Sequence, residues 1–180
     1  MNAVSVVVRI VAGRWRGRRI SAPKGTSVRP TLDSVREAWM SILQLDLPGA
    51  RVLDLYSGSG ALGLEALSRG AASAEFVERD PTSLRALEEN ISALGASDLV
   101  TVQRQSALSF ASGLGALDFD VAFADPPYAS GDAQRLAARW IGKPFSKVLG
   151  IEHSAKEAMP GNGVTRKYGS TAITFYRSEE

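Results

Sequence analysis

Four consecutive residues, Asp125-Pro126-Pro127-Tyr128, combine groups that could bind a planar amine. They follow the apolar segment Val121-Ala122-Phe123-Ala124, which is typical of a buried strand. The Asp125 carboxylate and the Pro126 carbonyl could each accept one hydrogen from an exocyclic NH2 group, and the prolines offer no competing N–H. Tyr128 supplies a ring on which a flat base could stack. The alternative is a strand that merely ends at two prolines, with an aspartate cap and an unrelated tyrosine.

Upstream, a second apolar segment leads into a glycine-rich loop. Residues 51–56 are typical of a buried strand and run directly into Ser57-Gly58-Ser59-Gly60-Ala61-Leu62-Gly63. The G-x-G-x-x-G spacing lets the backbone turn tightly and brings N–H groups and a helix N-terminus close to a ligand. Glu78 ends the next apolar segment, at the separation expected of an acid that binds ribose hydroxyls. Taken alone, this is the pattern of a dinucleotide site.

Two details favour S-adenosylmethionine over a nicotinamide cofactor. Asp54 comes just before the glycine loop, where an acid can meet a cationic amino-acid end but would repel a pyrophosphate. The downstream strand then ends in the amine-binding tetrapeptide, and no hydride-transfer site is evident. The combination of the two motifs therefore predicts methyl transfer to an exocyclic amine.

With these two motifs the chain resembles a known family. The small S-adenosylmethionine-dependent methyltransferases that act on exocyclic amines share a D-x-x-x-G-S-G loop, here Asp54 to Gly60, and a [DN]-P-P-[FYW] tetrapeptide. More narrowly, the chain is similar to the bacterial 16S ribosomal RNA guanine-N2 methyltransferases, whose family target is guanine 966. The further landmarks are residues 9–18, Arg29-Pro30-Thr31, Val35-Arg36-Glu37, residues 58–66 and Tyr168-Gly169-Ser170-Thr171. They span nearly the whole chain in the right order.

This resemblance implies a reaction and a set of site residues. The enzyme would transfer a methyl group from S-adenosylmethionine to N2 of a guanine in 16S ribosomal RNA, on the assembling small ribosomal subunit. Catalysis would rest on Asp125, Pro126 and Tyr128. The cofactor would be held by Asp54 at its methionine end, by the backbone of Gly58, Ser59 and Gly60, and by Glu78 at its ribose. The family usually places an acid after the third strand to receive the adenine amine, whereas this chain has Ser106, a weaker acceptor.

Composition excludes several other classes of protein. The chain has 180 residues, 44% of them hydrophobic, which is enough for one good core but hardly for two. No apolar run is long enough to cross a bilayer. The absence of cysteine excludes disulfides and cysteine-based zinc sites, and the single His153 argues against a histidine metal site or Ser-His-Asp chemistry. We expect a cytoplasmic, monomeric protein that binds no metal and no membrane.

The charge is distributed unevenly along the chain. Residues 1–36 carry eight basic side chains against Asp33 alone, a net charge of +7, while the remainder has thirteen basic and eighteen acidic side chains, a net charge of −5. A basic arm on an acidic body is typical of a phosphate-binding extension. A solvated basic surface that aids solubility is the alternative. The predicted RNA-binding residues are Arg9, Arg14, Trp15, Arg16, Arg18 and Arg19, with the Trp15 ring available for stacking.

The pattern of apolar residues predicts an α/β fold with a doubly wound, mainly parallel sheet of the Rossmann-like methyltransferase type. A small extension over residues 1–45 is expected to bind RNA through a hairpin of Val6–Ala12 and Gly17–Ala22 and a helix from Pro30-Thr31 through Gln44. Residues 46–180 form the methyltransferase domain, which ends in an antiparallel hairpin of Gly163–Tyr168 and Ala172–Arg177. Between a strand predicted near Leu99–Val102 and Gly115, the apolar residues are only weakly periodic, so no clear element is predicted there.

In such sheets ligands bind outside the carboxyl ends of the strands. The acids Asp54, Glu78 and Asp125 all come at predicted strand ends, so topology alone predicts that they share one site. Three other functions fit part of the pattern. They are an adenine-N6 methyltransferase acting on DNA or RNA, a non-catalytic RNA-binding ribosome-assembly factor that has kept a cofactor fold, and, last, a nicotinamide oxidoreductase.

Overall fold

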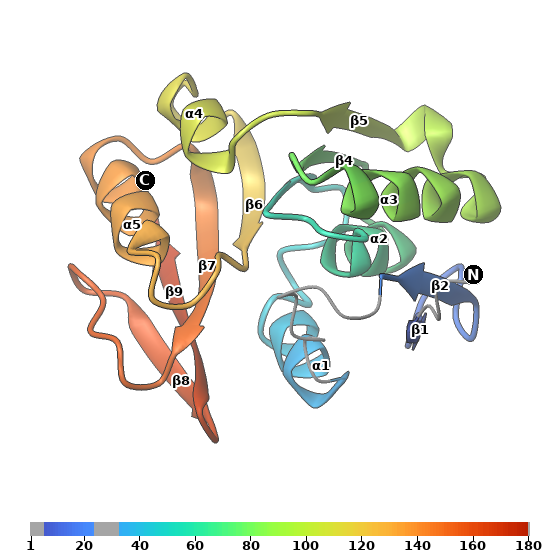
Figure 1. The fold of residues 1–180 in the computed structure, drawn as a ribbon. Coiled ribbons are helices and arrows are strands. Elements are labelled where there is room, and N and C mark those ends of the chain that lie inside the picture. The colour runs from blue at the N-terminus through green and yellow to red at the C-terminus, as the bar shows by residue number, and fades with distance from the viewer. Residues whose placement is uncertain (1–5, 24–32, 180) are drawn as a thin grey trace.

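A seven-stranded sheet forms the centre of the computed structural model, which describes residues 6–23 and 33–179 (Figure 1). The strand order is β5-β4-β3-β6-β7-β9-β8. Strands β3 to β7 pair in parallel, whereas β9 pairs antiparallel with β7 and β8 antiparallel with β9. The strands are β3 (Arg51–Leu55), β4 (Ser73–Val77), β5 (Val100–Gln103), β6 (Phe119–Ala124), β7 (Ser146–Ser154), β8 (Val164–Tyr168) and β9 (Thr171–Arg177). This confirms the predicted doubly wound sheet and its antiparallel C-terminal hairpin.

Helices cover both faces of this sheet. Side chains of α1, α2 and α3 join one apolar cluster with one face of the strands, and those of α4 and α5 join a second cluster on the other face. In the first cluster, the Trp39 ring packs on Phe123 and Phe175 at centroid distances of 5.2 and 5.9 Å. Because both faces are buried, the central strands are apolar along their length. The helices are α1 (Asp33–Ile42), α2 (Ala61–Ser68), α3 (Pro81–Leu94), α4 (Ala107–Ser112) and α5 (Asp132–Gly142), with a short 3-10 turn, η1 (Ser97–Leu99).

The basic extension forms the predicted hairpin, with shorter strands than expected. Strand β1 (Val6–Arg9) pairs antiparallel with β2 (Arg19–Ala22), and the residues between them form a compact turn. Ile10, Trp15 and Ile20 are buried in the same apolar cluster as α1 and α2. The extension therefore shares its apolar core with the body of the fold. The two hairpins lie at opposite ends of the molecule (Figure 1).

Several element boundaries differ from the prediction. Helix α1 ends at Ile42, short of Gln44, and its predicted start at Pro30-Thr31 lies outside the described residues. Helix α4 occupies the stretch that was expected to be only weakly periodic, and Ser106 is its N-cap. Within residues 6–23 and 33–179, no helix is long and apolar enough to span a membrane.

Candidate active site

Three carboxylates meet at one edge of the sheet. Asp54 lies in β3, Glu78 directly follows β4 and Asp125 directly follows β6. Strand β3 pairs with β4 on one side and with β6 on the other, in parallel, so the carboxyl ends of all three strands lie together. The structure thus brings together the three acids that the sequence placed at strand ends.

Asp54 is the most deeply buried of these acids, with 2% of its surface exposed. Its Oδ2 accepts a hydrogen bond of 3.0 Å from the backbone N–H of Gly63 in α2. Burial raises the pKa of the Asp54 carboxyl well above its usual range. The charges of Asp125 and Glu78 add to this rise, and the hydrogen bond from Gly63 opposes it. The site is therefore one in which negative charges repel one another, and a cation placed among them would be stabilised.

The glycine loop is fixed by Glu78. One carboxylate oxygen accepts the N–H of Gly58 at 2.9 Å, and the other accepts the N–H groups of Arg79 and Asp80 at 2.8 and 3.0 Å. Gly58 has a φ of +56°, which favours glycine, and a side chain at this position would meet no atom within 4 Å. The backbone at Gly58 is therefore open to a ligand. Glu78 positions the loop in addition to any contact with ribose.

The Asp125-Pro126-Pro127-Tyr128 tetrapeptide is tied to the C-terminal hairpin. Asp125 is partly buried, Pro126 is buried, and Tyr128 is partly buried. The Tyr128 hydroxyl lies 2.8 Å from Oγ1 of Thr171, the first residue of β9. The Ser130 hydroxyl donates to the Pro127 carbonyl at 2.7 Å, which closes the turn after the tetrapeptide. The Tyr128 ring is thus held by its hydroxyl as well as by its backbone.

Sequence reasoning missed the role of Tyr56 between the two motifs. Its φ of +57° is strained for a tyrosine, and its hydroxyl donates to Asp132 Oδ2 at 2.9 Å. Burial and, next, the hydrogen bond to Asp132 raise the pKa of Tyr56, so the hydroxyl remains a donor. Since Asp132 begins α5, this bond links the glycine loop to the segment that follows the tetrapeptide. The sequence signal that could have pointed to Tyr56 is its position as an aromatic residue just before a glycine loop.

Ser106 has a structural contact of its own. Its hydroxyl accepts the N–H of Ser109 at 3.4 Å, which caps helix α4. The hydroxyl that was expected to receive the adenine amine is thus already engaged as an acceptor, although it keeps a second lone pair. A contact between Ser106 and adenine stays a prediction.

Of the predicted RNA-binding residues, the five arginines are exposed, whereas Trp15 is buried. The side chains of Arg9, Arg14, Arg16, Arg18 and Arg19 are all exposed on the hairpin. Arg18 also donates to the carbonyl of Ala93 near the end of α3 at 2.7 Å, so it helps to seat the hairpin.

The ring of Trp15 is buried, although the sequence predicted that it would be available for stacking on a base. Only 8% of its surface is exposed, and its ring packs in the apolar cluster with the Arg14 guanidinium 5.4 Å from the ring centroid. Because the indole fills space between the hairpin and the body, its ring is not displayed for stacking on a base. The predicted stacking role is replaced by packing.

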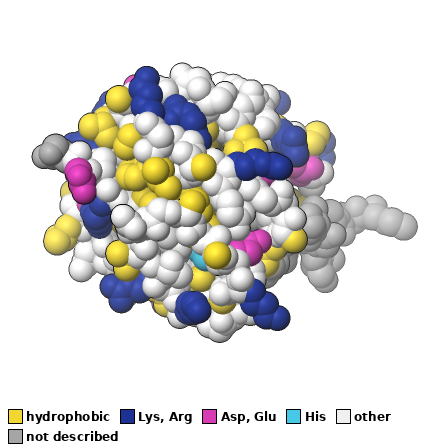
Figure 2. Space-filling view, turned by 90° about the vertical axis from the view of Figure 1, so that its left-hand side faces the viewer, with side chains coloured by type: hydrophobic (Ala, Val, Ile, Leu, Met, Phe, Trp, Pro, Cys, Tyr) yellow, Lys and Arg dark blue, Asp and Glu magenta, His cyan; other side chains and the backbone are white. Residues whose placement is uncertain are grey.

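On the face that carries α5 and the C-terminal hairpin, Lys and Arg side chains are scattered among uncharged ones (Figure 2).

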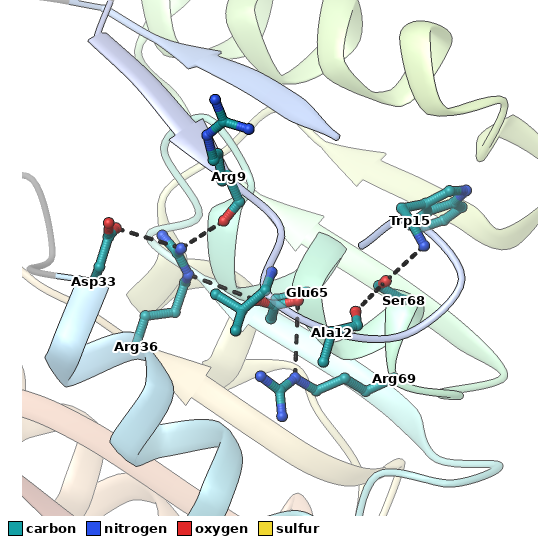
Figure 3. Close-up of polar contacts among 9 residues, drawn as sticks. Arg9, Ala12, Trp15, Asp33, Arg36, Glu65, Ser68 and Arg69 are labelled. Atoms are coloured by element: carbon teal, nitrogen blue, oxygen red, sulfur yellow. Dashed lines mark hydrogen bonds and ion pairs between the residues drawn. The ribbon is translucent and has the colours of Figure 1, made fainter. Parts of the chain in front are cut away.

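A buried polar network holds the hairpin against helix α2 (Figure 3). The Ser68 hydroxyl donates to the Ala12 carbonyl at 2.6 Å and accepts the Trp15 N–H at 3.0 Å. Gly13 approaches so closely that a Cβ there would lie 1.8 Å from the Ser68 carbonyl oxygen. Glu65, 1% exposed, lies beside them in the same helix.

The Glu65 carboxylate connects three segments of the chain. Its Oε1 accepts the backbone N–H of Val11 at 2.8 Å and lies 3.9 Å from Nε of Arg36, which is 2% exposed. Arg36 in turn donates to the Arg9 carbonyl at 2.7 Å. Oε2 of Glu65 lies 3.8 Å from Nε of Arg69. Sequence reasoning did not single out this network, because its partners are far apart in the chain.

Comparison with known proteins gives the family. The family described as Conserved hypothetical protein 95 matches residues 8–177. Ribosomal RNA small subunit methyltransferase D of Escherichia coli (strain K12) is 40% identical over 124 residues, which cover 69% of this chain and 62% of that protein. The aligned part thus spans under two thirds of that relative.

Two further likenesses cover nearly the whole chain. The protein of the same name from Haemophilus influenzae is 34% identical over 178 residues, covering 94% of this chain and 92% of that protein. The solved structure of the Escherichia coli protein yhhF superimposes with a TM-score of 0.83 at 31% identity, covering 97% of this chain and 99% of that one. The chain therefore belongs to the Conserved hypothetical protein 95 family and is a relative of the bacterial proteins named ribosomal RNA small subunit methyltransferase D.

Proposed function

We propose that this protein transfers a methyl group from S-adenosylmethionine to the exocyclic N2 of a guanine in 16S ribosomal RNA, as a monomer acting in the cytoplasm on the assembling small subunit. The observation that carries the proposal is the meeting of Asp54, Glu78 and Asp125 with an open glycine loop at one sheet edge. The names of the relatives in Escherichia coli and Haemophilus influenzae support the substrate class. The resemblance in the tetrapeptide and the N-terminal landmarks supports guanine N2 as the target.

The described residues fit S-adenosylmethionine. Its amino and sulfonium groups are cationic, and burial and neighbouring carboxylates raise the pKa of Asp54 in a site that favours a cation. The backbone at Gly58 is open to an approaching ligand. Asp54 would meet the methionine end and Glu78, beside Gly58, the ribose. Bound there, S-adenosylmethionine supplies an electrophilic methyl group on its sulfonium.

The tetrapeptide then acts on the target amine. The N2 lone pair of guanine is delocalised into the ring, which makes this nitrogen a poor nucleophile. Asp125 accepts one N2–H and the Pro126 carbonyl accepts the other, and together they turn the lone pair toward the methyl group. As the N–C bond forms, the bond between the methyl group and the sulfonium sulfur would break and leave neutral S-adenosylhomocysteine. The nitrogen would then carry the positive charge, which the Asp125 carboxylate would stabilise until an N2 proton passes to solvent. Orientation and electrostatics thus provide the acceleration.

The target base must leave its stack to reach this edge of the sheet. Tyr128 would lie against the flat face of the guanine and hold its plane. The hydrogen bond between its hydroxyl and Thr171 fixes the ring before the base enters. The C-terminal hairpin thereby contributes to the geometry of the reaction although it carries none of the reacting groups.

A transfer assay tests the proposal. Protein is incubated with S-adenosylmethionine labelled in its methyl group and with small-subunit particles that lack the methylation. We expect the label to enter 16S RNA and not ribosomal protein. Label in protein alone, or tight binding of NAD with no binding of S-adenosylmethionine, would contradict the proposed function.

The affinity for S-adenosylmethionine should depend on pH through Asp54. A bound cation stabilises the ionised carboxylate, so affinity should fall as the pH is lowered through the raised pKa of Asp54 in the free protein. Calorimetry over a series of pH values measures this dependence. Asp54→Asn should bind more weakly at high pH and should lose the part of the dependence that is due to Asp54. A wild-type affinity that rises as the pH falls would contradict the assignment.

The hairpin arginines should govern the salt dependence of RNA binding. Each phosphate contact releases counterions, so Arg14→Ala with Arg16→Ala should weaken RNA binding and lower the salt slope by up to about two units. The matched control is Arg166→Ala with Lys167→Ala, which removes the same charge from exposed positions in β8. RNA-binding titrations of the two double variants at several salt concentrations give the two salt slopes. Equal slopes for both double variants would show that the hairpin is only a solubilising surface.

A further inference from the structure

One buried amide joins the basic hairpin to the glycine loop. Asn90 lies in α3 with 3% of its surface exposed. Its Oδ1 accepts the backbone N–H of Ser21 at 3.0 Å, and its Nδ2 donates to the Ser21 carbonyl at 2.9 Å. Nδ2 also donates to the carbonyl of Ser59 at 3.0 Å. Both amide hydrogens therefore have acceptors, and these acceptors lie in two different segments.

On the hairpin side, Asn90 imitates a neighbouring strand. It pairs with both backbone groups of Ser21 in β2, as a strand partner would. Arg19, in the same strand, pairs with Arg9 of β1, so the held strand belongs to the basic surface. One side chain of α3 thus helps to fix the position of β2.

On the loop side, Asn90 fixes the peptide plane between Ser59 and Gly60. The Ser59 carbonyl accepts from Asn90, and the N–H of Gly60 donates to the Ser57 carbonyl at 2.8 Å, which closes the turn. The other end of the loop is held through Gly58 by Glu78. Asn90 is thus a direct hydrogen-bonded connection between the hairpin and the turn that would receive the cofactor.

We propose that Asn90 is a positioning residue that couples the two binding surfaces, so that RNA on the hairpin and S-adenosylmethionine in the glycine loop bind cooperatively. This inference rests on the proposed function. A ligand that restrains the loop restrains the Asn90 amide and, through it, strand β2, while RNA held by the hairpin restrains the loop by the same route. By linkage the effect is reciprocal: each ligand should raise the affinity for the other by the same factor, within the usual range of about 5–150-fold.

A variant of Asn90 and a control variant of Ser68 distinguish loss of the coupling from loss of the contacts that hold the hairpin on the body of the fold. Asn90→Asp keeps an acceptor for the Ser21 N–H but, as a carboxylate, has no hydrogen to donate to the carbonyls of Ser21 and Ser59. Ser68→Ala is the matched control, because it removes the hydrogen bonds of the Ser68 hydroxyl with Ala12 and Trp15 of the hairpin turn, at the end of α2 that lies far from the glycine loop. Asn90→Ala, which removes both sides of the bridge, is the second variant should Asn90→Asp fail to fold.

Hydrogen exchange of the segment containing residues 19–22 gives a readout that does not need RNA. S-adenosylhomocysteine, the demethylated product, is added at saturation, and its binding is verified by calorimetry for each variant. We expect several-fold slower exchange in the wild type when the ligand is bound. Both variants should start less protected, since each removes a hydrogen bond to the hairpin, but Ser68→Ala should still respond to the ligand whereas Asn90→Asp should lose the response. Calorimetry with and without RNA should show the affinity linkage in the wild type and Ser68→Ala and its loss in Asn90→Asp.

The outcomes distinguish this inference from the function on which it rests. An equal ligand response in Asn90→Asp and the wild type, or no linkage in a wild-type protein that binds both ligands, would overturn the coupling alone. Failure of the wild type to bind either ligand would overturn the proposed function and the coupling with it.

Discussion

Replacing Asp125 with alanine should lower the rate of methyl transfer by about 10²–10³-fold, because this removes the negative group that faces the developing charge. The position supports this expectation, since Asp125 directly follows β6 and its charge acts on buried Asp54. Asp125→Asn should retain more activity than alanine. An amide oxygen still accepts one hydrogen from the target amine, but it carries no charge.

Binding measurements separate chemistry from cofactor affinity in these variants. Calorimetry with S-adenosylmethionine should show affinity largely preserved in Asp125→Ala, because the proposed main partner of this residue is the target amine. Single-turnover rates on undermethylated small-subunit particles then report the chemical step. Wild-type turnover in the alanine variant would mean that the tetrapeptide is only a strand end.

Glu65→Ala should destabilise the fold by about 3–5 kcal/mol, because it removes the buried carboxylate beside the Arg36 guanidinium and leaves Arg36 to the exposed carboxylate of Asp33, 3.4 Å away. Arg36 and Glu65 are 2% and 1% exposed, and their closest atoms are 3.9 Å apart. The same substitution removes the acceptor of the Val11 N–H, so the hairpin loses part of its seat (Figure 3). Urea unfolding measures the loss in free energy.

A double variant distinguishes the pair from simple loss of packing. Arg36→Met with Glu65→Leu replaces both charges by apolar groups of similar volume, and should be much less destabilising than Glu65→Ala because no charge is left buried alone. A free-energy loss in Glu65→Ala of less than about 1 kcal/mol, the range of an exposed ion pair, would contradict the buried network.

The sheet and the convergence of the acids could be predicted because both depend on local patterns. Continuous apolar runs mark the buried parallel strands, and glycine, proline and acidic residues mark their ends. Asp80, an acid directly before Pro81, caps α3 by accepting the Ser83 N–H at 2.8 Å. Once strand and helix alternate, topology alone brings Asp54, Glu78 and Asp125 to one edge.

The contacts between the extension and the body could not be predicted in this way. Trp15 among arginines is equally consistent with a stacking ring and a packed one, and only the approach of α2 makes it packed. Asn90 and Arg36 lie 69 and 27 residues from the backbone groups that they bind at Ser21 and Arg9. No local period encodes such pairs, so the contacts that link the hairpin arginines to the glycine loop are found only in the three-dimensional structure.

The identity of the modified nucleoside tests the central claim most directly. Small-subunit particles that lack the methylation are incubated with the protein and S-adenosylmethionine, and their 16S RNA is digested and analysed by mass spectrometry. We expect N2-methylguanosine with the wild-type protein and a large loss of it with Asp125→Ala. N6-methyladenosine would instead indicate the adenine-directed alternative. Unmodified RNA from a wild-type protein that binds both the particle and the cofactor would contradict the account.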